Sequence, residues 1–143
     1  MDPFTAIGLA GNIITFIDFG FQVVSTAREI YGSNSGTTSE NEDLEFLTGK
    51  VSNLALNLDP KIPTSQMTDD ERNLNSVAVE CARLSNDLLD LLKNLKARKT
   101  GSTKESLRAV WRNIWKKKEK TELEKRLERC RQLLHLQLTS AAR

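Results

Sequence analysis

Charged side chains are almost missing from the first 31 residues of this chain. Between Asp2 and Arg28 the only ionised side chain is that of Asp18. A helix on the surface of a soluble protein normally carries charges along its solvent face. Segment 1–31 is therefore predicted to be either the central helix of a bundle or a helix that can enter a membrane. A secretory signal peptide is not predicted, because the basic n-region and the small-residue cleavage site are missing.

Residues suited to catalysis are also scarce. The single histidine, His135, lies in a leucine-rich stretch, and the chain has neither a P-loop nor a dinucleotide-binding fingerprint. A lone helical histidine is more often a surface or packing residue than a general base. The acidic run Asp69-Asp70-Glu71 follows Thr68 at a helix start, where the helix dipole favours negative charge. We therefore expect no enzyme, no cofactor and no metal site.

The chain has only two cysteines, Cys81 and Cys130, and three prolines. The cysteines occupy apolar positions of separate predicted helices, which is typical of buried thiols in a reducing compartment rather than of a disulfide framework. The prolines lie at one helix start and in one short connection, and no alternating strand pattern appears. These features predict an all-α fold, an up-and-down helical bundle of four to five helices formed by a single domain, 1–143.

Apolar periodicity and capping patterns set the predicted boundaries. Ser39 with Glu42, and Thr68 with Glu71, form capping boxes, and each is followed by leucines at alternating three- and four-residue spacing. The predicted elements are an apolar N-terminal helix over 1–31, a flexible linker over 32–41, and amphipathic helices over 42–58, 69–96 and 104–138. Whether the last segment is one helix or two stays open.

The first helix is predicted to have an apolar arc that includes Ile14, and an opposite face that is small and weakly polar, with Phe19 at the margin of that opposite face. Residues 3–17 span about 22 Å as a helix, short of the ~30 Å hydrocarbon core. A longer span would include Asp18, at ~2.5–3.5 kcal/mol. Conditional insertion and a buried bundle helix both stay open. The membrane-insertion candidates are Phe4, Ile7, Leu9, Ile13, Ile14, Phe16, Ile17, Phe19 and Phe21, and the polar-face candidates are Thr15, Asp18 and Gln22.

Charge is distributed unevenly along the chain. Residues 1–95 carry 6 basic and 14 acidic side chains, whereas residues 96–131 carry 14 basic and 5 acidic ones. Such blocks indicate helix faces that attract one another across a bundle, or a surface that binds anionic lipid. Nucleic acid is not an expected partner, because Trp111 and Trp115 have the spacing of core residues and no binding motif accompanies them. The anionic-lipid candidates are Arg108, Arg112, Lys116, Lys117 and Lys118.

Several runs of residues resemble one protein family. They are DPFTAIGLA at 2–10, NII at 12–14, FIDFG at 16–20, EIY at 29–31, Val110-Trp111 and ELEKRL at 122–127. Together they resemble the N-terminal HeLo-like domain of fungal NACHT-type, NOD-like (STAND) NTPase receptors, across essentially the whole chain. That domain is a helical bundle that acts as an effector of programmed cell death in heterokaryon incompatibility and defence, and it is similar to the bundle of the animal mixed-lineage kinase domain-like protein.

The resemblance implies a mechanism and a location. A C-terminal NACHT NTPase module of a longer parent chain would cluster the domain, which would self-associate and engage anionic membrane lipid through its N-terminal helix. The protein would be cytoplasmic at rest and at the plasma membrane on activation. The NACHT module is not in this sequence, so the chain is expected to be an excised domain or a free-standing relative. A non-lytic adaptor bundle that oligomerises or recruits a partner is the alternative.

The basic block generates a first prediction. If Lys116, Lys117 and Lys118 hold anionic lipid, the clustered protein should bind acidic liposomes and dissociate from them as salt is added. The reason is that electrostatic attraction between exposed charges decays over about 10 Å at 0.1 M ionic strength. Liposome flotation at two salt concentrations measures this. Equal binding to neutral and acidic liposomes would leave the block as a solvated helix face.

Overall fold

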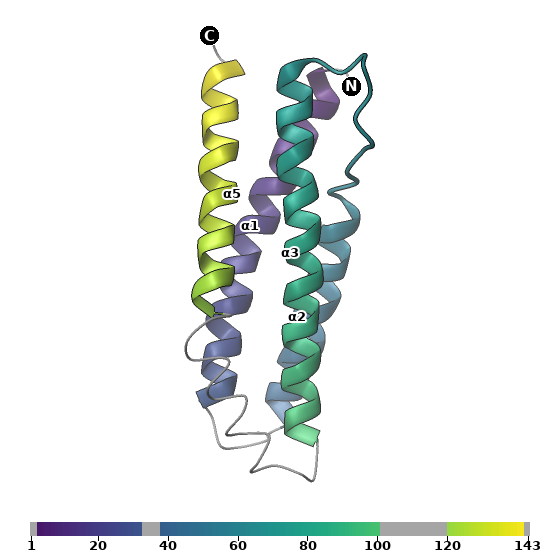
Figure 1. The fold of residues 1–143 in the computed structure, drawn as a ribbon. Helices are drawn as coiled ribbons and strands as arrows, with labels where there is room; N and C mark the ends of the chain where they lie inside the picture. Colours follow the sequence, from purple (N-terminus) through teal and green to yellow (C-terminus); the bar gives the residue numbers. More distant parts are fainter. Residues whose placement is uncertain (1–2, 33–37, 101–119, 142–143) are drawn as a thin grey trace.

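The computed structural model describes residues 3–32, 38–100 and 120–141, and the side chains of residues 6–30, 41–96 and 122–139. The described residues form four helices and no strand: α1 (Pro3–Gly32), α2 (Thr38–Leu56), α3 (Asp69–Thr100) and α5 (Lys120–Ala141). Each described helix runs in the opposite direction to the described helix before it, and the start of α1 lies at the same end of the bundle as the end of α5 (Figure 1). The predicted all-α, up-and-down bundle is confirmed.

Two of the helices are central. Both α1 and α3 pack against all three other helices, whereas α2 and α5 make no contact with each other within the described residues. The apolar N-terminal segment is thus an interior element of the bundle. Its neighbours cover different sides of it, with α2 and α5 flanking the α1–α3 pair (Figure 1).

The start of α3 follows the predicted capping pattern. The backbone N–H of Glu71 donates to the Thr68 hydroxyl at 3.1 Å, and Asp69, Asp70 and Glu71 occupy the first turn. A side-chain oxygen that accepts from one of the first N–H groups satisfies a donor that the helix itself leaves free. The capping box therefore located this boundary correctly, although α3 continues to Thr100, four residues beyond the predicted end.

The predicted limits of the second helix need correction. It begins at Thr38 rather than 42, so part of the predicted linker 32–41 is helical, and the acidic residues Glu40 and Glu42 fall in its first turns, where the dipole favours them. It ends at Leu56 rather than 58, where i→i−3 hydrogen bonds tighten the chain and Asp59 adopts a φ of 33°. The last helix, predicted over 104–138, is described only from Lys120, and the rest of that range lies outside the described residues.

A buried amide holds the connection between α2 and α3 against the bundle. Asn75 of α3 is 2% exposed, accepts from the Lys61 backbone N–H at 2.8 Å and donates to the Lys61 carbonyl at 2.7 Å. From α1, Asn12 donates to the Asn57 carbonyl at 3.0 Å. Backbone groups of a connection that lies close to the core need such partners, so these two asparagines fix residues 57–61.

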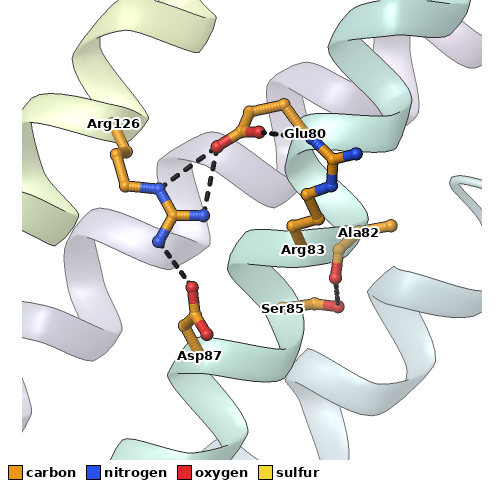
Figure 2. A network of polar contacts seen from close by, with 6 residues as sticks. All are labelled: Glu80, Ala82, Arg83, Ser85, Asp87 and Arg126. Atoms are coloured by element: carbon orange, nitrogen blue, oxygen red, sulfur yellow. Dashed lines mark hydrogen bonds and ion pairs between the residues drawn. The ribbon is translucent and has the colours of Figure 1, made fainter.

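Opposite charges connect α5 to its two neighbours. Arg126 donates two hydrogen bonds of 3.1 Å to Glu80 of α3 and a third to Asp87 of the same helix (Figure 2). Burial lowers the pKa of the Arg126 guanidinium, but the hydrogen bonds and charges of Asp87 and Glu80 outweigh burial and raise that pKa overall. On the α1 side, Arg28 pairs with Glu124. Ion pairs thus join α5 to both α3 and α1, and the charge of Arg126, in the basic part of the chain, is balanced by two acidic residues of α3.

One glycine permits a close approach of helices. A methyl group in place of the Gly20 hydrogen would meet the Leu127 side chain at 2.7 Å. Leu127 of α5 is fully buried, so a larger residue at position 20 of α1 would clash with its side chain. Gly20 therefore allows α5 to pack directly onto α1.

The core face of α3 generates the second prediction. Leu84 and Leu88 are both fully buried, so Leu84→Ala and Leu88→Ala should each lower the free energy of unfolding by about 2–5 kcal/mol, through lost burial and the cavity left behind. Urea denaturation followed by circular dichroism measures the change. Asn86→Ala, at an exposed position of the same helix, is the matched control. An unchanged midpoint for either leucine variant would contradict this placement of the core face.

Candidate functional site

The candidate functional site is sought first among the titratable side chains and clefts of the described residues. Within them, no cluster of three or more histidine, cysteine or acidic side chains has a metal-binding arrangement, and His135 is exposed on α5. A surface cleft of about 500 Å³ lies between α3 and α5 and contains no nucleophile or histidine. Its lining residues are Asp87, Asp90, Leu91, Asn94, Glu122, Leu123 and Arg126. We therefore consider helix α1 as the candidate functional element.

One face of α1 forms a large part of the core. The buried hydrophobic residues of this helix are Leu9, Ala10, Ile13, Phe16, Ile17, Phe19, Val23, Val24, Ala27 and Ile30. Phe21 is half-buried against the same core, and the Arg131 guanidinium of α5 lies 5.3 Å from the centre of its ring. Phe16 is thus a core residue of the resting bundle, and Phe21 packs against the core in part.

The opposite face of α1 is exposed and nearly uncharged. Thr15, Asp18 and Gln22 are all exposed, as expected. The Thr15 hydroxyl donates to the Gly11 carbonyl of the same helix at 3.0 Å, so the hydroxyl proton already has an acceptor. A hydroxyl satisfied within its own helix needs no water to remain paired. The exposed positions within residues 6–30 are Ile7, Gly8, Gly11, Ile14, Thr15, Asp18, Gln22, Ser25, Arg28 and Glu29.

Two assignments on α1 are wrong. Ile14 was expected on the buried arc, but its side chain is 43% exposed, whereas Phe19, expected at the margin of the polar face, is 5% exposed. The reason is the position of α2, which packs on the Phe19 side and places the Lys50 ammonium 4.7 Å from the centre of the Phe19 ring. Helix α1 contacts three neighbours rather than one, so its buried surface is wider than, and rotated from, the predicted arc.

The remaining candidates differ in exposure or lie outside the description. Leu9, Ile13 and Ile17 are buried, whereas Ile7 is 71% exposed. The side chain of Phe4 lies outside the described residues, as do the anionic-lipid candidates Arg108, Arg112, Lys116, Lys117 and Lys118. Most of the membrane-insertion candidates are thus core residues of the bundle, and the anionic-lipid candidates lie outside the described residues.

Helix α1 is long and apolar enough to cross a membrane. The qualifying stretch is Ala6–Ile30, 25 residues that contain an 18-residue window with a mean hydropathy of 1.6, and 44% of that window is buried within the bundle. At a rise of about 1.5 Å per residue this length exceeds the ~30 Å hydrocarbon core. The core helix of a soluble protein can satisfy the same criteria, so length and composition alone do not assign a membrane role.

Comparison of the chain with known proteins identifies no relative. No protein family, curated protein or solved structure gives a significant match to the chain. What α1 does must therefore be argued from its own residues and from its place in the bundle.

Neighbouring isoleucines of α1 provide the third prediction. Ile13 has no exposed surface and Ile14 is 43% exposed. Ile13→Lys should destabilise the bundle by several kcal/mol, because it buries an unpaired charge. Ile14→Lys should leave the free energy of unfolding within about 1 kcal/mol of the parent, as surface substitutions usually do. Thermal unfolding by circular dichroism distinguishes the two, and equal destabilisation would contradict the orientation of α1.

Proposed function

We propose that this chain is a signalling and cell-death effector domain of the kind found at the N-terminus of fungal NOD-like receptors. At rest it is a soluble cytoplasmic bundle with α1 inside. When a C-terminal NACHT NTPase module clusters several copies, the domains self-associate at the plasma membrane. Helix α1 then leaves the bundle and engages anionic membrane lipid. The sequence resemblance motivates this assignment, and the placement and surface of α1 support it.

The observation that carries the proposal is the nearly uncharged exposed face of a central helix. From Ala6 to Ala27, Asp18 is the only charged residue of α1, and the exposed positions include Ile7 and Ile14. Helix α3 is equally central but exposes charges along its whole described length: Asp69, Asp70, Arg72, Arg83, Asp87, Asp90, Lys93 and Lys96. A core helix needs only one apolar face, whereas a helix that enters lipid must place all sides in an apolar medium.

Energetics explain why the bundle is the resting state. Burying one large aliphatic or aromatic side chain contributes about 1.5–3 kcal/mol, so removing α1 from its neighbours into water forfeits on the order of 10–20 kcal/mol. Transfer of α1 into lipid can recover most of this burial free energy, minus about 2.5–3.5 kcal/mol for inserting Asp18. Release is therefore favourable only where lipid receives the helix as it leaves the bundle. Clustering at a membrane provides that condition.

A non-lytic adaptor is the second candidate, and the outer face of α5 favours it. Leu133 and Leu136, three positions apart and therefore on one side of the helix, are 44% and 66% exposed. Exposed apolar side chains that lie close together indicate a surface that contacts other proteins. In that case α1 would serve only as core, and the domain would signal by self-association or by recruiting a partner.

The fourth prediction separates the two candidates. Thr15→Lys adds a charge to the exposed face of α1, so the bundle should stay folded, yet the substitution should abolish dye release from acidic vesicles after forced oligomerisation through a fused oligomeric coiled coil. The added charge raises the cost of insertion by about 2.5–3.5 kcal/mol, roughly a hundredfold in equilibrium. Leakage rate and thermal midpoint are both measured.

Ser76→Lys is the matched control, because it adds the same charge at an exposed position of α3. It should fold and release dye like the parent. If Thr15→Lys is well folded and as active as the parent, or if the clustered parent releases no dye, α1 is only core and the adaptor function replaces the proposed one.

A further inference from the structure

The antiparallel register of α3 and α5 is set by polar contacts at two levels. Arg126 binds Glu80 and Asp87 towards the start of α5, and near its end Gln137 donates to Asp70 at 2.9 Å. Advancing along α5 therefore corresponds to going back along α3. Between these two levels the register brings Cys130 of α5 to the level of Cys81 of α3.

The two thiols meet inside the α3–α5 interface. Cys81 and Cys130 are 0% and 1% exposed, both are free, and each lies near enough to shift the pKa of the other. They are also the two cysteines of the whole sequence. An intramolecular disulfide in this protein can therefore join only these residues. Their proximity could not be deduced from the sequence, because it depends on how two helices 49 positions apart align.

We propose that Cys81 and Cys130 are a reversible redox pair whose disulfide covalently connects α3 to α5. With a peroxide as oxidant, the sulfur of one cysteine attacks a peroxide oxygen and the O–O bond breaks, which gives a sulfenic acid and water. The second thiol then attacks the sulfenic sulfur, the S–O bond breaks, and a second water leaves with the thiol proton. In total, two thiols lose two electrons and two protons, and one peroxide becomes two waters.

The two cysteines influence each other's ionisation. The interaction with Cys130, together with burial, raises the pKa of the Cys81 thiol well above its usual range. The interaction with Cys81 lowers the pKa of Cys130, and the positive charges of Arg126 and Arg129 act in the same direction, against burial and Glu80. The thiolate is the reactive form of cysteine. Once the interface opens, either thiol can attack the oxidant, and the other then resolves the sulfenic acid.

The pair also connects the helices that retain α1. Helix α1 packs against both α3 and α5, so a covalent link between those two opposes the separation that would release it. Because both sulfurs are buried, an oxidant reaches them when this interface opens. After one thiol is oxidised, the disulfide would form when α3 and α5 pack together again, and it would hold the bundle in the resting state. This regulatory role rests on the proposed function, whereas formation of the disulfide does not.

The disulfide is tested on the purified full chain. Hydrogen peroxide should remove two hydrogen atoms from the intact mass without forming dimers, and dithiothreitol should reverse the change. The oxidised protein should melt about 10 °C higher than the reduced one, because the link closes a loop of roughly 50 residues in the unfolded chain. Cys81→Ala is the control: its Cys130 should be trapped as a sulfenic acid by dimedone, with no gain in thermal midpoint.

Free thiols after oxidation, intermolecular dimers alone, or a disulfide without a gain in thermal midpoint would each overturn the redox pair. The regulatory role is measured separately, as dye release by clustered oxidised and reduced protein. Oxidised protein should release dye at least tenfold more slowly, and equal rates would overturn the role. If the reduced protein releases no dye either, the proposed function fails while the disulfide stands.

Discussion

The packing of α1 against its three neighbours is the constraint on which the rest of the structure depends. Among the described helices, α5 contacts α1 and α3 but not α2, and it approaches α1 closely because Gly20 leaves room for Leu127. Helix α2 covers the opposite side and places Lys50 over Phe19. An apolar helix in this position supplies core surface to every other helix. Its removal would therefore expose apolar surface on each of the other three described helices, which couples release of α1 to loss of much of the core.

Most of the fold could be predicted from the sequence because three of the four described helices have strongly periodic patterns. The leucines of α3 repeat with helical spacing, and Thr68 marks its start, so both its face and its first residue were correct. The orientation of α1 was harder to predict. Its side chains differ too little in polarity to define a single buried face. Ile14 and Phe19 were assigned on the assumption of one apolar arc, whereas α1 packs against three helices.

The features that join distant segments could not be predicted at all. Asn75 holds the Lys61 backbone, Arg126 binds two carboxylates of α3, and Cys81 meets Cys130, and each of these contacts depends on interhelical register rather than on local sequence. They share a physical consequence, since all of them hold α3 to its surroundings. Helix α3 thus serves as the fixed centre of the bundle. Helix α1 is the better candidate to move, because within the described residues its polar links to other elements are those of Asn12 to the α2–α3 connection and of Arg28 to α5.

The central claim is that α1 exchanges protein neighbours for lipid when the domain is clustered. Photo-crosslinking from Phe16, which is 1% exposed, tests it most directly, with p-benzoylphenylalanine in place of the phenylalanine ring. In the monomer the benzophenone should crosslink only to other residues of the chain. In the clustered protein on acidic vesicles the account predicts crosslinks to lipid acyl chains. Clustered protein that makes the vesicles leak while position 16 still crosslinks only to protein would contradict it.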